Sequence, residues 1–231
     1  MTLPAAGSRQ HVVDQRSDPG GKERYGAVLL LLLTTFLFLA VGPEGRWVRL
    51  VSTVLQGATL LAALWASRTS HRLFRAAAVA VVCGVVAAAA SMAVQSSAAE
   101  GGAFGLNALL VAGAPVAIVR GELRRRTVDI QTVLAAICVY VLIGMLFAFL
   151  FGSINNFGSA SFFAQTQHPS TADFQYFSFV TLTTVGYGDL TAAGDLGRTL
   201  AVLEALVGQL YLVTVVALLV SNLSQNRVRA P

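Results

Sequence analysis

The sequence predicts an all-α membrane protein with six transmembrane helices and a short re-entrant helix between the fifth and the sixth. Three observations support this prediction. Only 12% of the 231 residues are charged, 55% are hydrophobic and the mean hydropathy is +0.69, whereas a typical soluble domain has about 25% charged residues. The apolar residues form long runs, and the basic residues cluster between these runs. This composition excludes a disordered chain and argues against an ordinary soluble domain.

Six mostly apolar segments are long enough to be membrane spans, because about 20 residues of helix cross a hydrocarbon core of roughly 30 Å. They are residues 26–42, 50–66, 76–94, 103–119, 133–151 and 199–221. The third segment is rich in alanine, which suits close helix packing in lipid. Pro115 lies in the fourth segment and predicts a kink or an early end of that helix.

The basic residues orient the chain. With a cytoplasmic N-terminus, 13 of the 16 Lys and Arg residues lie on the cytoplasmic side, as the positive-inside rule requires. We therefore expect a multi-pass protein with both termini in the cytoplasm. A cleaved signal peptide ending near Ala40 and Gly42 is the alternative for the first segment, but the long polar stretch before it argues against one.

This orientation divides the chain into five parts. We expect a cytoplasmic tail at 1–25, a four-helix transmembrane domain at 26–119, a cytoplasmic linker at 120–132, a second membrane domain at 133–221 and a short cytoplasmic tail at 222–231. The absence of a sorting signal in the sequence, and of a glycosylation acceptor in a predicted outer loop, favours the plasma membrane of a prokaryote.

The segment between the last two spans differs from the rest of the chain. Residues 153–169 are polar with scattered phenylalanines, which is typical of an outer loop, and 170–173 resemble a capping box. The apolar run 174–183 then predicts a helix of about 11 residues, which is about 16 Å long and too short to cross. The helix must enter the membrane and return. The residues after it should line a path filled with water or ions, because irregular backbone is tolerated at that depth only there or inside protein.

Residues 184–189 read Thr-Val-Gly-Tyr-Gly-Asp, and this motif resembles the selectivity filter of the potassium channel family. The resemblance extends over residues 133–221, which correspond to the outer helix, pore helix, filter and inner helix of that family. It implies a pore domain at 133–221 and passive, potassium-selective transport. For the first four spans the resemblance is architectural only.

The residue types of the motif fit a ring of backbone carbonyls. Successive carbonyls point at one axis when the backbone alternates between right- and left-handed conformations, and Gly186 and Gly188 adopt the left-handed ones without a Cβ clash. Val185 and Tyr187 then point away from the axis, and Thr184 adds its hydroxyl oxygen at the inner end. We expect K⁺ to bind through Thr184, Val185, Gly186 and Tyr187.

One filter per chain implies an assembly. In the family four chains supply the ring, so we expect a homotetramer in the lipid bilayer. K⁺ is then the permeant ion, and no cofactor is expected. The sequence contains no nucleophile paired with a base, no metal-spaced His/Cys set and no phosphate loop, which argues against an enzyme, and its arginine clusters do not form a nucleic-acid-binding face. A separate regulatory subunit is left open.

Two other membrane functions compete with a channel. Potassium transporters repeat such pore units four times in one chain, whereas this sequence has one. A non-conducting modulatory subunit has no need for both filter glycines.

Three positions outside the filter core are candidates for supporting it. In the family an acid after the filter bonds to an aromatic residue of the pore helix, which matches Asp189 with Tyr176; a solvated charge at the mouth is the alternative. Glu204 is the only carboxylate well inside a span, which favours a brace behind the filter over direct ion coordination. Gly208 is the first gating candidate, as a hinge of the inner helix, with close helix packing as the alternative.

Gating candidates lie further along the last span. Val216 and Val220 share a helical stripe with Gln209 and Leu212 that would face the cavity, and a constriction near Val220 would close the pore by dewetting. The architecture resembles that of voltage-gated channels without the charged fourth helix, because residues 103–119 contain no charge. We therefore expect weak voltage dependence or none.

Overall fold

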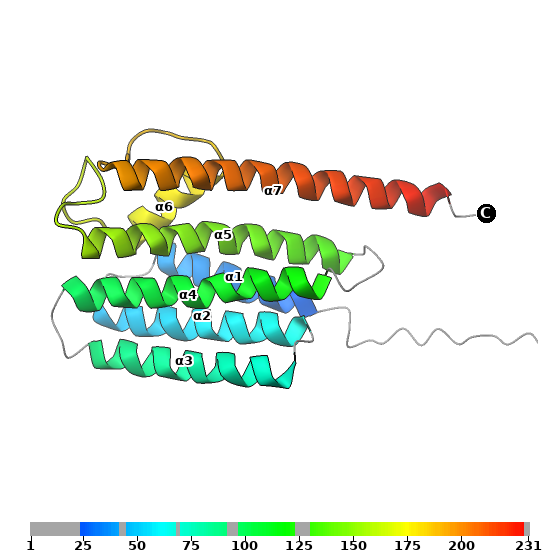
Figure 1. Cartoon of the computed structure of the whole chain (residues 1–231), viewed down its shortest axis with the longest axis horizontal. Helices are drawn as coiled ribbons and strands as arrows, with labels where there is room; N and C mark the ends of the chain where they lie inside the picture. The colour runs from blue at the N-terminus through cyan, green and yellow to red at the C-terminus, as the bar shows by residue number, and fades with distance from the viewer. Residues whose placement is uncertain (1–23, 42–44, 68–69, 92–96, 123–129, 229–231) are drawn as a thin grey trace, which may run out of the picture.

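The structure, a computed structural model, describes residues 24–41, 45–67, 70–91, 97–122 and 130–228, which form seven α-helices (Figure 1). The helices are α1 Arg24–Val41, α2 Arg46–Ala66, α3 His71–Ser91, α4 Ser97–Glu122, α5 Ile130–Phe157, α6 Thr171–Leu182 and α7 Asp195–Val228. The predicted all-α class is confirmed. The expected tail at 1–25 lies almost wholly outside the described residues, as does most of the linker at 120–132.

Each of the six predicted spans lies largely within one long helix. Within the described residues, four stretches are long and apolar enough to cross a membrane: His71–Ala89, Gly101–Glu122, Ile130–Phe157 and Asp195–Leu218. The apolar parts of α1 and α2 are shorter, at Tyr25–Val41 and Leu50–Ala66.

One alternative at Pro115 and one expected boundary are wrong. Pro115 does not end α4 early, because the helix continues to Glu122; membrane helices tolerate proline where neighbouring groups satisfy the freed carbonyl. α5 runs past residue 151 into the predicted outer loop and ends at Phe157. In this extra stretch the Ser153 hydroxyl donates to the carbonyl of Gly101 at 3.2 Å, which connects the end of α5 to α4.

α5 is the central helix of the fold. It packs against α1, α4, α6 and α7, while α2 packs against α1, α3 and α4. In Figure 1 the six long helices run side by side, and the short α6 lies next to α5 and α7. One continuous apolar core joins α1, α2 and α4 to α5, with Leu32, Leu110 and Leu142 among its buried members.

The apolar interior of the first four helices also contains uncharged polar side chains. Thr35, Ser52, Thr53, Gln56, Thr59 and Asn107 are buried there. Thr53 donates to the Asn107 amide oxygen at 3.0 Å.

α7 is covered on one side only. Its inner side contacts α5 and α6, whereas Leu203, Leu206, Leu210 and Val213 are about half exposed or more in the single chain. A long apolar helix with such a face needs lipid or protein against it.

Candidate functional site: the loop between α6 and α7

The start of α6 is fixed by the predicted capping box. The Ser170 hydroxyl accepts from the Asp173 amide at 3.1 Å, and the Asp173 carboxylate accepts from the Ser170 amide at 2.8 Å. The helix has 12 residues and ends at Leu182, so it is about 18 Å long. Because the helix dipole is negative at its C-terminus, the loop that begins at Thr183 lies at an end that favours cations.

A phenylalanine cluster holds the outer end of α6. Phe147, Phe151, Phe162, Phe163, Phe174 and Phe177 are all buried and in mutual ring contact. The cluster joins α5, the loop before α6 and α6 itself. These phenylalanines had no predicted role, although nine aromatic residues within the 31 positions 147–177 were the available signal.

The loop before α6 pairs with the segment that follows the candidate filter. Phe163 and Ala192 form an antiparallel bridge, and the Gln165 side chain bonds Thr191 twice, donating at 2.8 Å and accepting at 2.9 Å. Arg198 donates from Nε to the Ala192 carbonyl at 3.0 Å. The loop is therefore anchored at both ends.

The backbone of residues 184–188 alternates in handedness. Thr184 has a φ of 58°, Gly186 of 58° and Gly188 of 83°, whereas Val185 and Tyr187 are not in this left-handed region. The two glycines adopt the expected conformation. Thr184 was not expected to do so, because a β-branched residue at positive φ costs on the order of 1–3 kcal/mol.

Hydrogen bonds to α6 hold this conformation. The Thr184 amide donates to the Thr181 carbonyl at 2.9 Å, and the Val185 and Gly186 amides donate to the Val180 carbonyl at 2.9 and 3.3 Å. In a trans peptide the carbonyl points opposite to the amide N–H of the next residue, and the described residues contain no cis peptide. The carbonyls of Thr183, Thr184 and Val185 therefore point away from α6, where they are free to bind a cation.

The outer end of the loop is held by two tyrosines and an aspartate. Tyr176 donates its hydroxyl to Asp189 at 2.8 Å, the pairing that the resemblance implied. Tyr187 stacks on Tyr176 with a 6.4 Å centroid distance and parallel rings. Val185 and Tyr187 are 52% and 71% exposed in the single chain, so a neighbouring molecule has room to pack on them.

Glu204 lies behind α6 and is fully buried. Its Oε1 is hydrogen bonded to the Ser178 hydroxyl, which also donates to the Gly144 carbonyl of α5 at 2.6 Å. This position favours the bracing role over direct ion coordination, because the carboxyl group faces α6 from behind. Sequence analysis identified Glu204 but missed its partner Ser178.

Gly208 lies one helical turn after Glu204, against the last residue of α6. A Cβ atom at this position would be 2.6 Å from the Leu182 carbonyl oxygen and 2.7 Å from Leu182 Cδ1. The contact favours the packing explanation for this glycine. The same Leu182 carbonyl accepts from the Tyr140 hydroxyl of α5 at 3.3 Å.

Tyr140 and Tyr211 form a second connection between α5 and α7 that sequence analysis missed. Their rings stack with a centroid distance of 6.0 Å, and Tyr211 donates to the Ala136 carbonyl at 2.7 Å. A tyrosine inside an apolar span was the available signal, because a hydroxyl group in lipid needs a partner.

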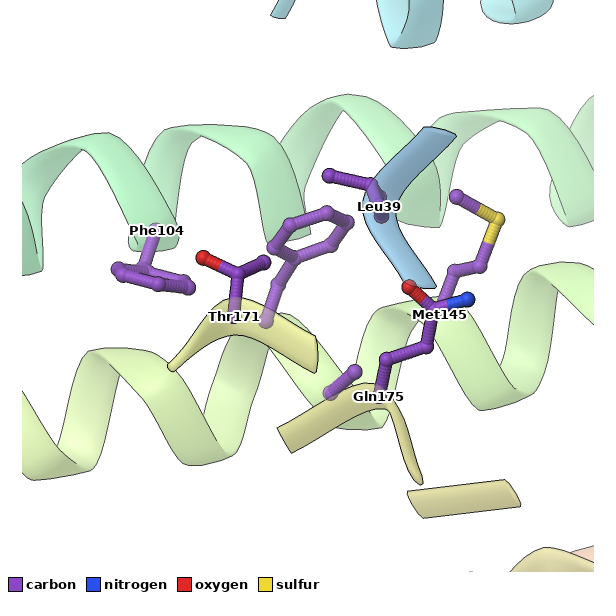
Figure 2. A pocket seen from close by; sticks show the side chains of 7 residues that line it. Leu39, Phe104, Met145, Thr171 and Gln175 are labelled. Carbon is purple, nitrogen blue, oxygen red and sulfur yellow. The ribbon is translucent and has the colours of Figure 1, made fainter. Parts of the chain in front are cut away.

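The first helix reaches α6 directly. Gln175 donates to the Phe36 carbonyl at 3.0 Å. Beside this bond lies a small pocket, and Figure 2 shows Gln175 extending from α6 toward Leu39 of α1 and Met145 of α5, with Phe104 of α4 on the far side. The four-helix part and α6 are therefore in contact at this junction.

The two gate candidates lie in the second half of α7. The Val216 side chain is about half exposed, on the part of α7 that extends beyond α6. Val220 lies in the same helix, but its side chain is outside the described residues. The gate stays a prediction.

Comparison with known proteins gives the following matches. Residues 135–225 match the model of a family described as ion channel. Over 85 residues the chain is 38% identical to potassium voltage-gated channel subfamily A member 2 of Xenopus laevis, a match that covers 35% of this chain and 17% of the relative. It is 36% identical over 85 residues to subfamily A member 10 and to subfamily A member 4 of Homo sapiens, again over 35% of this chain and over 17% and 13% of those relatives. The match therefore covers less than a fifth of the length of these relatives. No solved structure gives a significant match.

Proposed function

We propose that the chain is a member of the potassium channel family and forms a potassium-selective channel that conducts K⁺ passively across a membrane, because residues 135–225 match an ion channel family and 85 residues are 38% identical to a voltage-gated potassium channel. The same matches indicate a channel and not an enzyme. The observation that carries the proposal is the alternating backbone of residues 184–188, in which the amides of Thr184, Val185 and Gly186 donate to α6. Backbone carbonyls that face one axis replace the hydration shell of K⁺.

The resemblance of the motif to a potassium-channel filter supplies the proposed binding atoms, and the orientation of the Thr184 and Val185 carbonyls supports two of them. K⁺ binds to carbonyl oxygens of Thr184, Val185, Gly186 and Tyr187, with the Thr184 hydroxyl at the inner end and Gly188 closing the loop. Asp189 and Tyr176 hold the outer end of the filter, and their 2.8 Å hydrogen bond supports this role. No charged side chain is needed for selectivity.

The working unit is a homotetramer in the lipid bilayer. A single chain supplies one strand of carbonyls, and a ring around an ion requires several. The uncovered face of α7 and the exposed Val185 and Tyr187 side chains support this assembly, because subunits arranged around the axis would cover them.

Six of the helices cross the plasma membrane, with α6 as the re-entrant pore helix and both termini in the cytoplasm. Residues 26–119 form a sensor-like domain without gating arginines, residues 120–132 the linker, and residues 133–221 the pore domain. The tails are 1–25 and 222–231. The gating candidates are Val216 and Val220 together with Gly208, which lies between them and the filter.

Reconstitution tests the proposal. Purified protein in liposomes should release K⁺ down its gradient, exclude Na⁺ and be blocked by Ba²⁺. Equal flux of K⁺ and Na⁺ would refute selectivity. An absence of flux would favour a non-conducting modulatory subunit, and flux that requires a second ion gradient would favour a potassium transporter subunit.

A further inference from the structure

A chain of polar groups connects three helices behind the candidate filter. It runs from the Glu204 carboxyl group in α7 through the Ser178 hydroxyl in α6 to the Gly144 carbonyl in α5. Ser178 and Glu204 are both 0% exposed even in the single chain. The missing side chain at Gly144 allows the close approach, because a Cβ there would lie 2.7 Å from the Phe179 ring of α6.

The number of protons in this chain of groups determines the form of the carboxyl group. A serine hydroxyl carries one proton, and an ionised carboxylate and a backbone carbonyl are both acceptors only. If Glu204 were ionised, Ser178 could donate its single proton to Glu204 or to Gly144, but not to both. The remaining contact would bring two oxygens together with no proton between them. With a neutral Glu204, its own O–H donates to Ser178, and Ser178 donates to Gly144. Only the neutral form turns both contacts into hydrogen bonds.

The surroundings of Glu204 agree with a neutral acid. Its second oxygen, Oε2, is buried and has no hydrogen-bond partner, and leaving a neutral carbonyl oxygen unpaired costs less than leaving a charged one unpaired. No cationic group among the described residues interacts with it. The titratable group that faces it from α5 is Tyr140, and the hydroxyl of Tyr140 donates to the Leu182 carbonyl of α6.

We propose that Glu204 is a positioning residue that acts as a neutral carboxylic acid, and that its relay through Ser178 to Gly144 fixes the height of α6 against α5 and α7. Ser178 lies four residues before Leu182 in α6, and Glu204 lies four residues before Gly208 in α7. The Ser178–Glu204 and Leu182–Gly208 contacts are therefore one helical turn apart, and together they fix the register of α6 against α7. The filter loop follows α6 directly. A shift of α6 would therefore move the carbonyl groups of the filter loop.

The protonation is tested by infrared spectroscopy of the purified wild-type protein at neutral pH. A neutral carboxylic acid has a carbonyl stretching band that carboxylates lack, and this band shifts in D₂O. The wild type should show one such band that is absent in Glu204→Gln. It should persist in the matched control Asp195→Asn, because Asp195 is an exposed carboxylate at the start of α7. A wild type without the band, or a band that survives in Glu204→Gln, overturns the proposal.

The positioning role is tested by two substitutions of similar size. Glutamine keeps a donor for Ser178 without charge, whereas methionine fills the space without a donor. We expect Glu204→Gln to keep the K⁺/Na⁺ flux ratio of the wild type and Glu204→Met to lower it on the order of tenfold, since a buried hydrogen bond is lost. Equal ratios in the two variants overturn the positioning role.

The flux measurement rests on the proposed channel function, and the infrared band does not. A wild type that shows the band but passes no K⁺ therefore refutes the channel proposal while leaving the neutral acid intact.

Discussion

Replacement of Gly208 by alanine tests how closely α7 packs on the end of α6. The added Cβ would stand 2.6 Å from the Leu182 carbonyl oxygen, 2.7 Å from Leu182 Cδ1 and 3.2 Å from Leu182 Cγ. The side-chain atoms can rotate away, but the carbonyl oxygen belongs to the backbone of the last α6 residue. To restore ordinary van der Waals contact at about 3.4 Å, the two helices must separate by nearly 1 Å at this point.

The expected cost is that of overpacking, about 1–3 kcal/mol per subunit. Alanine also gains about 1 kcal/mol of helix propensity over glycine, so the comparison needs a control that has the gain without the clash. Gly102 in α4 provides it, because it is helical and a Cβ there meets nothing within 4 Å. Gly208→Ala should therefore be less stable than Gly102→Ala by about 1–3 kcal/mol.

Thermal unfolding of the purified protein in detergent measures this difference. For a chain of this size 1 kcal/mol corresponds to about 2–4 °C, so Gly208→Ala should unfold several degrees below Gly102→Ala. Its K⁺/Na⁺ flux ratio should also fall, because the displaced Leu182 lies two residues before Thr184. If both variants unfold at the same temperature and remain equally selective, the close contact does not limit the structure and the packing explanation is wrong.

Three further predictions concern the filter and the fourth helix. Gly186→Ala should abolish K⁺ flux because a side chain at φ 58° is strained by about 1–2 kcal/mol per subunit. The control Gly194→Ala should conduct normally, because Gly194 has neither a positive φ nor a neighbour within 4 Å. Equal K⁺ flux in the two variants would contradict the filter assignment. Tyr176→Phe removes the donor to Asp189, and its K⁺ flux should decline faster during continuous recording than that of the wild type; an unchanged time course would argue against the brace. Because residues 103–119 carry no charge, single-channel recordings should give a shallow relation between open probability and voltage, and a curve as steep as several gating charges per subunit would refute weak voltage sensing.

The sequence by itself determined the features that depend on neighbouring residues. Ser170 and Asp173 are three residues apart, so their capping bonds follow from local geometry. The left-handed conformations at Gly186 and Gly188 follow in the same way, because only the missing Cβ makes them cheap. The number of long apolar segments and the shortness of α6 are also local properties, since both follow from residue count and hydrophobicity.

The tertiary structure decided which distant groups meet. Ser178 finds Gly144 and Glu204, and Tyr140 reaches Leu182, across separations of 26 to 42 residues. A helical pattern reveals the apolar side of each helix, but not the rotation and height at which two helices contact. Thr184 illustrates the same limit: its left-handed backbone opposes its own preference and is held by the carbonyls at the end of α6. Local geometry therefore selected the residues of this loop, and packing against α5, α6 and α7 fixed where their oxygens point.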